Sequence, residues 1–282
     1  MAEFTRESTQ KIVQTSEWKV EINDAGSGYP IFLLHGSGPG ATGWTNYAPN
    51  IGPLAQKYRV IALTFPGWGL SDPVEPGREP QRKTNARSVK LVMDELGIEK
   101  AAIVGNSMGG AALQQFVVDF PERLSHFVTM GATAPGTGIF VPGGMTEGIR
   151  ILNETYREPT MENFRRLVQI MVYDASFVTD ELCELRSKAA LANKVHLENF
   201  LNPKRNGLPG GDETIAALAA AKVPALIVHG RDDRTVPMEN SMRLNAIMQN
   251  ARALIFNHCG HWAQIEHADE FNRMLDSFIS HA

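Results

Sequence analysis

A serine in this sequence has the surroundings of a catalytic nucleophile. Ser107 lies in Gly105–Gly110 (Gly-Asn-Ser-Met-Gly-Gly), which follows an apolar run and precedes a helical pattern. Glycines at these positions allow a tight strand-to-helix turn that exposes the serine hydroxyl at the edge of a sheet, beside a helix N-terminus. A Gly-x-Ser-x-Gly match alone is weak evidence, because an ordinary glycine-rich strand–helix turn has the same composition.

A serine hydroxyl needs a base, and the base needs an acid that orients it. Asp233 and His261 each follow a short apolar run, so the chain presents the three residues in the order Ser, Asp, His. This order is typical of α/β hydrolases and differs from that of two other triad folds. Parallel strands would bring all three residues to one sheet edge. We therefore predict a catalytic triad of Ser107, Asp233 and His261.

Two neighbouring residues are alternatives within this triad. Asp232 is a rival acid, but the Gly-x-x-Asp spacing favours Asp233 and leaves Asp232 solvated or paired with an arginine. His258 is a rival base. His261 is favoured because Gly260 allows a tight loop that aims it inward, whereas His258 is expected to be a packing or supporting residue.

A glycine-rich loop after the first central strand predicts an oxyanion hole. In His35–Gly40 (His-Gly-Ser-Gly-Pro-Gly), we expect the N–H of Ser37 to act together with that of Met108. Each such donor is worth about 2.7–4 kcal/mol in the transition state. A phosphate-binding loop is the alternative, but the GxGxxG and GxxxxGK[ST] spacings are absent. His35 is expected to brace the loop.

The elements that must position these residues alternate between short apolar runs and helical patterns. Runs that are apolar on both faces suit a sheet covered by helices on both sides. The fold class is therefore α/β, with a mostly parallel, doubly wound sheet. Strands are predicted at Tyr29–Leu34, Val60–Leu63, Ala101–Val104, Leu124–Met130, Ala225–His229 and Arg252–Phe256, after an early half-exposed strand around Val20. Helices are predicted at Asn85–Leu96, Met108–Asp119, Asn240–Met248 and Glu270–Ile279.

One segment interrupts this alternation. Thr133–Gly144 and Asn202–Gly211 are rich in glycine and proline, and the chain between them shows helical periodicity without strands. Such an insertion predicts a helical lid over the carboxyl edge of the sheet. We expect core residues 1–137, a lid at 138–206 and core residues 207–282. The lid helices are predicted at Met145–Tyr156, Met161–Val172 and Thr179–Ala192.

Composition excludes several classes of protein. The 282 residues carry 31 acidic and 27 basic side chains, a balance that argues against a nucleic-acid surface. The longest apolar run, Ile215–Ala221, is too short to span a bilayer, and the first twenty residues lack a signal-peptide core. Cys183 and Cys259 fit no metal-ligand spacing. We expect a cytoplasmic protein with a small-molecule ligand and no metal, nucleic-acid or membrane partner.

The segments around the predicted site resemble those of the meta-cleavage-product hydrolases. These serine enzymes of the α/β-hydrolase fold break carbon–carbon bonds in ring-fission products of aromatic compounds, such as 2-hydroxy-6-oxo-6-phenylhexa-2,4-dienoate. Asn106, the Ser-Gly-Pro-Gly loop and Trp262 are more particular to this family than the triad, which esterases and haloperoxidases share. The resembling segments are His35–Asn46, Val104–Gly110, Gly230–Pro237, Cys259–Gln264 and Glu266–Arg273.

The resemblance implies a set of substrate-binding residues. Asn106, Arg186 and Trp262 would hold the carboxylate and dienol end of the substrate, for which an arginine fork and an amide are suitable partners. On their own, Arg186 is equally well a surface charge, Asn106 a turn residue and Trp262 a packing residue. Further substrate-binding residues implied by the resemblance are Gly36, Gly38 and Asn46.

The resemblance also implies the reaction. Epoxide hydrolases and haloalkane dehalogenases need Asp where this chain has Ser107, so attack on a carbonyl is expected. The dienol would be ketonised with His261 as the proton carrier. Ser107 would then attack the C6 ketone, releasing 2-hydroxypenta-2,4-dienoate, and water would hydrolyse the acyl-enzyme. No cofactor is required, and relatives are commonly homodimers or larger. The alternatives are a carboxylesterase or lactonase, and a non-catalytic small-molecule-binding protein.

Two features stay open at this point. Relatives usually carry an Asp shortly after the second central strand, where this chain has Thr64–Gly67, which puts the local loop structure in doubt. The C6 substituent of the substrate, whether methyl, phenyl or larger, cannot be read from the sequence. Candidates for the acyl-side pocket are Met145, Ile149, Met171, Tyr173 and Val236.

Overall fold

The computed structural model describes residues 4–138, 140, 144–205 and 211–281, and is built on one eight-stranded sheet in the order β1-β2-β4-β3-β5-β6-β7-β8. β2 pairs antiparallel with β1 and β4, and every other pair is parallel. The strands are β1 (Gln10–Gln14), β2 (Lys19–Gly26), β3 (Tyr29–Leu34), β4 (Tyr58–Leu63), β5 (Ala101–Asn106), β6 (Leu124–Met130), β7 (Ala225–Gly230) and β8 (Ala251–Phe256).

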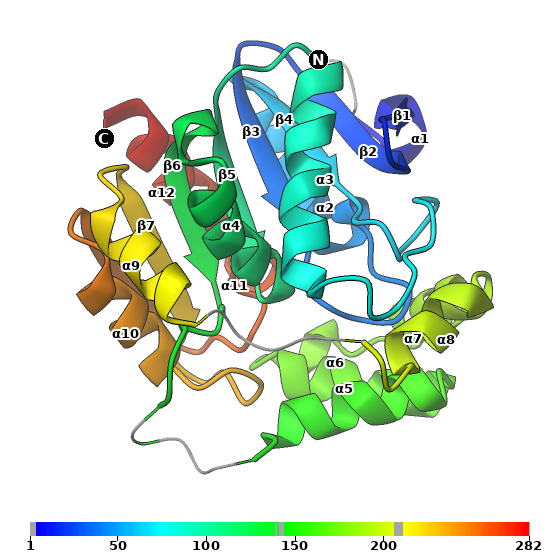
Figure 1. The fold of residues 1–282 in the computed structure, drawn as a ribbon. Coiled ribbons are helices and arrows are strands. Elements are labelled where there is room, and N and C mark those ends of the chain that lie inside the picture. Colours follow the sequence, from blue (N-terminus) through cyan, green and yellow to red (C-terminus); the bar gives the residue numbers. More distant parts are fainter. Residues whose placement is uncertain (1–3, 139, 141–143, 206–210, 282) are drawn as a thin grey trace.

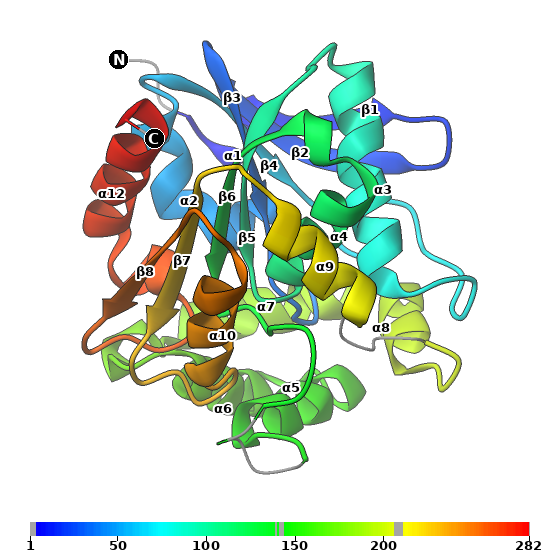
Figure 2. The ribbon, with the colours of Figure 1, turned by 60° about the vertical axis from the view of Figure 1, so that its left-hand side comes forward.

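Helices cover both faces of the sheet, as Figures 1 and 2 show. One layer packs over a core that includes Phe116 and Leu244, and the other over a core that includes Tyr47 and Phe271. The first layer is α3 (Gln81–Glu95), α4 (Met108–Asp119), α9 (Asp212–Ala220) and α10 (Glu239–Ile247). The second is α2 (Gly43–Leu54), α11 (Ala263–Glu266) and α12 (Ala268–His281), with the short α1 (Arg6–Thr9) beside β2.

Burial explains why the central elements form. All six residues of β5 are buried, as expected of a strand with neighbours on both edges and helices on both faces. In α3, Val89, Val92 and Met93 are buried at the spacing of one helical face. The parallel strands therefore end at a common edge, and the loops that leave this edge carry Ser37, Ser107, Asp233 and His261.

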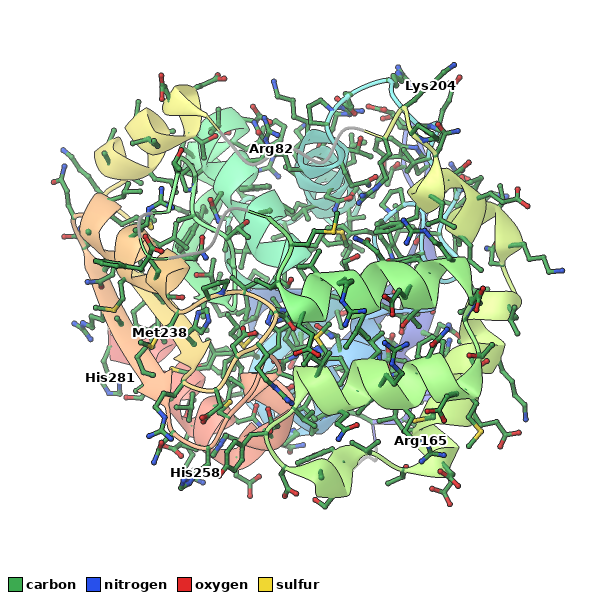
Figure 3. All side chains as sticks on the ribbon, turned by 90° about the horizontal axis from the view of Figure 1, so that it is seen from below. Arg82, Arg165, Lys204, Met238, His258 and His281 are labelled. Atoms are coloured by element: carbon green, nitrogen blue, oxygen red, sulfur yellow. The ribbon has the colours of Figure 1, made fainter. Side chains whose placement is uncertain are left out.

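A helical lid lies across this edge, below the sheet in Figure 1 and facing the viewer in Figure 3. The hydroxyls of Thr146 and Thr160 accept the N–H groups of Ile149 and Asn163, which caps the first two lid helices. The lid has its own apolar cluster, which extends to Trp262 of the core. Its helices are α5 (Glu147–Arg157), α6 (Met161–Met171), α7 (Asp180–Leu191) and α8 (Lys194–Leu201), with a 3₁₀ turn at Ala175–Phe177.

The structure confirms the predicted fold class, and the predicted elements are present with ends that differ by a few residues. Apart from 3₁₀ turns, six elements were not predicted: α1, β1, α2, α8, α9 and α11. The edge strand β1 is mostly polar, and α2 contains Pro49 and Pro53, which resemble loop signals. The lid boundaries at 138 and 206 stay predictions, since residues 139, 141–143 and 206–210 lie outside the described part of the chain.

The start of α4 packs against β3 with no room for a side chain. A Cβ atom added to Gly109 would overlap with the carbonyl group of Leu34, and one added to Gly105 would overlap with the backbone of Gly109. These contacts fix the first turn of α4 directly beneath the loop that carries Ser37.

Replacement of Gly109 by alanine should therefore destabilise the protein by about 1–3 kcal/mol, the usual range for overpacking. The matched control is Gly52→Ala in α2, where an added Cβ meets nothing within 4 Å. Because alanine is the better helix former, this variant should be at least as stable as the wild type. Urea denaturation measures both, and equal stability of the two variants would contradict the packing argument.

Candidate active site

Ser107 stands in a strained turn between β5 and α4. Its φ is 52° and its ψ is −111°, and only His258 shares a positive φ among the described non-glycine residues. The N–H of Ser107 donates to the carbonyl oxygen of Met130 at 2.8 Å. A Cβ on Gly110 would overlap with Ala132, so the turn closes tightly. Strain of this kind persists where the surrounding structure over-determines it, and such sites are often functional.

Asp233 and His261 form a buried hydrogen-bonded pair. Nδ1 of His261 lies 2.6 Å from Oδ2 of Asp233, and both side chains are almost inaccessible to solvent. The other carboxylate oxygen of Asp233 accepts the N–H groups of Thr235 and Val236, at 2.7 and 2.9 Å. With Nδ1–H donating to the carboxylate, Nε2 of His261 carries the lone pair that a base requires.

Two residues that the sequence analysis missed complete this pair. Gly131 has φ 52°, and a Cβ there would lie 2.8 Å from Nδ1 of His261 and 3.2 Å from Oδ2 of Asp233. His229 is fully buried, with its Nε2 2.9 Å from the carbonyl oxygen of Val236 and 3.3 Å from Asp233. For Gly131, the available signal in the sequence was its position directly after a strand. His229 lies four residues before Asp233 and belongs to no motif.

The electrostatics of the pair keep Asp233 ionised. Burial alone would raise the pKa of Asp233, but the charge of His261 and the hydrogen bonds from His229 and His261 outweigh it. The pKa of the carboxyl therefore lies far below its usual range. A carboxylate that is charged at neutral pH favours the imidazole tautomer with its proton on Nδ1, and it would stabilise an imidazolium.

Asp232 and His258, the alternatives to Asp233 and His261, have other contacts. Asp232 accepts the N–H of Cys259 at 3.3 Å, and its Oδ1 lies 3.6 Å from Arg231. His258 is exposed, and its ring packs against Tyr173 with a centroid distance of 5.0 Å. The structure therefore brings Asp233, not Asp232, to the imidazole of His261.

The loop after β3 presents backbone N–H groups to the site. Neither the N–H of Ser37 nor that of Met108, the first residue of α4, donates to a described residue. The N–H of Gly36 donates to Oδ1 of Asn46 at 3.2 Å. Asn46, predicted to bind substrate, thus directs its amide oxygen to the loop. Both Ser37 and Ser107 line one cavity, as an oxyanion hole requires.

His35 braces this loop from beneath. Its Nε2 accepts the N–H of Phe65 at 3.0 Å, and its Nδ1–H donates to the carbonyl oxygen of Gly36 at 2.8 Å. Burial lowers the pKa of His35 to about 4, against the smaller opposing effect of the Gly36 bond. The imidazole is therefore neutral at pH 7. The segment Thr64–Gly67, which departs from the family pattern, supplies the Phe65 N–H to this brace.

Tyr156 of α5 is a further residue that the sequence analysis missed. Its hydroxyl lies 3.0 Å from Oγ of Ser37 and accepts the N–H of Gly38 at 3.0 Å and Nε1–H of Trp68 at 3.2 Å. A lid side chain thus holds the loop that carries one predicted oxyanion donor. No motif marks this tyrosine, since only the docking of the lid brings it to the loop.

The lid also contacts the loops of Asp233 and His261. The hydroxyl of Thr146 donates to the carbonyl oxygen of Thr235 at 2.7 Å. The N–H of His261 donates to the carbonyl oxygen of Met171 at 2.7 Å, where α6 ends. Together with Tyr156, these bonds attach the lid to the oxyanion, acid and histidine loops of the site.

The residues expected at the carboxylate end are buried and incompletely paired. The Arg186 guanidinium lies 4.8 Å from the ring centre of Trp262, and its Nε has no hydrogen-bond partner in the described part of the chain. Burial lowers the pKa of Arg186 to about 10. Asn106 donates weakly to the carbonyl oxygens of Met130 and His261, at 3.3 and 3.4 Å, while its Oδ1 has no partner among the described residues.

These residues do not share a cavity with Ser107. Arg186 lines a second hollow of about 420 Å³ with Gly40 and Thr42, whereas Ser107 lines a cavity of about 320 Å³ with Ser37. The loop after β3 thus contributes Ser37 to one space and Gly40 to the other. The Ser107 cavity is also lined by Gln81, Arg82, Met108, Ala111, Gln114, Thr133, Ala134, Pro135, Ile149, Leu152, Asn153, Phe200, Arg205, Thr214 and Val236.

The predictions for the acyl-side pocket are only partly confirmed. Ile149 and Val236 line the Ser107 cavity. Met145 and Tyr173 are 72% and 50% exposed, so both predictions were wrong: each residue lies just outside a lid helix and faces outward. Met171 is buried, with its sulfur 3.3 Å from the hydroxyl of Thr235, and serves the docking of the lid.

Comparison with known proteins agrees with this geometry. A family model described as alpha/beta hydrolase fold matches residues 29–268. A 2-hydroxy-6-oxononadienedioate/2-hydroxy-6-oxononatrienedioate hydrolase of Paraburkholderia xenovorans is 45% identical, with 99% of this chain and 98% of the relative covered. A 2-hydroxy-6-oxo-6-phenylhexa-2,4-dienoate hydrolase of Burkholderia cepacia is 41% identical, with 99% of each covered.

A solved structure adds the three-dimensional match. A serine-to-alanine mutant of the meta-cleavage product hydrolase CumD from Pseudomonas fluorescens IP01, complexed with acetates, has a TM-score of 0.86 and 34% identity, over 96% of this chain and 97% of that one. The chain belongs to the meta-cleavage-product hydrolases. It is thus an α/β-hydrolase-fold enzyme that acts on a small molecule, and no described helix of this hydrolase is long and apolar enough to cross a membrane.

The contacts of Tyr156 predict a kinetic defect without a change in the triad. Tyr156→Phe removes the acceptor of the Gly38 N–H and should lower kcat by about 10- to 100-fold, the equivalent of about 1–3 kcal/mol for an unsatisfied buried donor. KM should change much less, because the oxyanion donors act mainly in the transition state. Tyr173→Phe, on the exposed part of the lid, is the control. A purely KM effect in Tyr156→Phe would refute the role.

Proposed function

We propose that this hydrolase cleaves the C5–C6 bond of 2-hydroxy-6-oxohexa-2,4-dienoate-type ring-fission products. The observation that carries the proposal is the buried Asp233–His261 pair together with the cavity lined by Ser37 and Ser107, in a chain 45% identical to a 2-hydroxy-6-oxononadienedioate hydrolase. The buried Arg186 guanidinium on Trp262 would act as the carboxylate partner if its separate hollow opens to that cavity when substrate binds. A buried cation without an acidic partner is costly, and a substrate carboxylate would offset this cost.

Ketonisation is the first step. The 2-hydroxyl of the dienol loses its proton and C5 gains one, which converts the conjugated dienol into a ketone with a tetrahedral C5. Nε2 of His261 is the proton carrier, since Nδ1 is committed to Asp233. Oδ1 of Asn106, which has no partner among the described residues, is a suitable acceptor for a hydrogen bond from the 2-hydroxyl before proton transfer.

Carbon–carbon cleavage follows by acyl transfer. Oγ of Ser107 passes its proton to His261 and adds to the C6 carbonyl, and the N–H groups of Ser37 and Met108 hold the resulting oxyanion. Collapse of this intermediate breaks the C5–C6 bond. The electron pair moves into the dienolate, which takes a proton and leaves as 2-hydroxypenta-2,4-dienoate. Water, deprotonated by His261, then hydrolyses the acyl-serine to a carboxylic acid.

Location and assembly are further parts of the proposal. Cys183 and Cys259 are both buried free thiols, which suits a reducing cytoplasm. We expect a homodimer or a larger homo-oligomer, which light scattering on the purified protein would measure.

The reaction is tested by a steady-state assay with dienolates that carry methyl, phenyl or charged groups at C6, and with a p-nitrophenyl ester. The yellow dienolate should disappear with release of the pentadienoate, and Ser107→Ala should lower the rate by at least about 10³-fold. Rapid turnover of the ester with persistence of every dienolate would favour an esterase. Binding without turnover of any substrate would favour a non-catalytic binding protein.

Arg186→Met separates substrate binding from stability. The variant should raise KM for dienolates by about 10- to 100-fold, because a hydrogen bond to a charged group contributes about 1.5–3 kcal/mol. The free energy of unfolding should not fall, since the variant removes an unpaired buried charge. Arg165→Met is the control, as Arg165 pairs with Asp180 at the lid surface (Figure 3). Unchanged KM for dienolates would remove Arg186 from the site.

A further inference from the structure

The cavity beside Ser107 is lined by both apolar and polar groups. Met108, Ile149, Leu152 and Val236 contribute apolar side chains, whereas Gln81, Arg82, Asn153 and Arg205 contribute polar and basic ones. None of the described lining residues carries a carboxylate. An acyl group that fills this cavity thus has both apolar side chains and positive charge around it.

Arg205 is held at this cavity by stacked rings. Its Cζ lies 4.0 Å from the ring centre of Phe200, and Phe200 stacks on Tyr156 with a centroid distance of 3.4 Å and an interplanar angle of 6°. The hydroxyl of the same Tyr156 contacts Ser37. The guanidinium is therefore positioned relative to the loop of Ser37 through two rings, and none of its N–H groups donates to a residue that the structure describes.

No acidic residue in the described part of the chain neutralises Arg205. Two acids, Glu75 and Glu79, line an adjoining small hollow with Arg205. Glu75 is exposed, and the oxygens of Glu79 pair with Arg87 at 2.6 and 2.8 Å. Burial lowers the pKa of Arg205, as expected for a cation without a counter-charge. Arg82, labelled in Figure 3, has a side-chain partner, because its Nε–H donates to Oε1 of Gln115 at 2.9 Å.

We propose that Arg205 binds a second carboxylate at the far end of the acyl group, so that the preferred substrates are 2-hydroxy-6-oxo-dienedioates. This assignment rests on the proposed function. The acyl half of such a substrate is a short methylene chain that ends in a carboxylate. The methylenes fit the apolar side chains and the carboxylate fits the guanidinium, whereas a phenyl group would leave the guanidinium unpaired.

The test compares two substrates of nearly equal size, 2-hydroxy-6-oxonona-2,4-diene-1,9-dioate and its C9 methyl ester, in which only the distal charge differs. The wild type should prefer the dioate by at least about tenfold in kcat/KM. Arg205→Met keeps an unbranched stem over Phe200 but removes the charge. This variant should lose about 10- to 100-fold on the dioate, mainly through KM, and less than about threefold on the ester.

Arg157→Met, an exposed arginine at the end of α5, is the control and should keep the wild-type preference. If the wild type cleaves the dioate and the ester equally well, the assignment of Arg205 is wrong while the proposed function stands. An equal loss on both substrates in Arg205→Met would mean that Arg205 only supports the lid, which also overturns the assignment. A wild type that cleaves a p-nitrophenyl ester and neither dienolate overturns the proposed function itself.

Discussion

The hydrogen bond between Asp233 and His261 is the interaction on which the rest of this structure depends. A carboxylate excluded from water is tolerated only when its lone pairs are used. Here the imidazole and the N–H groups of Thr235 and Val236 use them, and His229 lies beside the shared oxygen. The space for the pair exists because β6 is followed by Gly131. The order of the strands and the positions of their ends bring Asp233 and His261 together, and Gly131 leaves the space that their hydrogen bond needs.

The fold, and the placement of Ser107, Asp233 and His261 at one edge of the sheet, were predictable because local rules specify them. A strand, a glycine-rich turn and a helix around Ser107 leave few possible geometries, and the order of Ser107, Asp233 and His261 follows the order of the strands. Tyr156 and Arg205 were not predictable in this way. Both act through the packing of the lid on the core, and neither stands in a motif. The role of Tyr156 depends on Ser37, far away in the sequence, and that of Arg205 on the stack that Phe200 forms with Tyr156.

The same distinction explains the errors at the acyl pocket. Met145 and Tyr173 were chosen for their size and their place near the lid helices, but the helix termini carry them outward. Ile149 lies inside α5, where the helical period directs it to the cavity. Likewise, the resemblance predicted that Arg186 binds the substrate. Its burial against Trp262 and its position in a separate hollow could be seen only in the folded structure.

Helix α5 contributes both to the wall of the Ser107 cavity and to the support of the Ser37 loop. Ile149 and Asn153 form part of the wall against which an acyl group would lie, and Tyr156, one turn further on, supports the loop of the oxyanion donors. A helix shifts as a unit, so backbone movement that admits a bulkier acyl group would also displace Tyr156. Selection for new substrates is therefore expected to exchange side chains at 149 and 153 rather than to move the helix. Substrate range can then diverge among descendants of this chain without disturbing its chemistry.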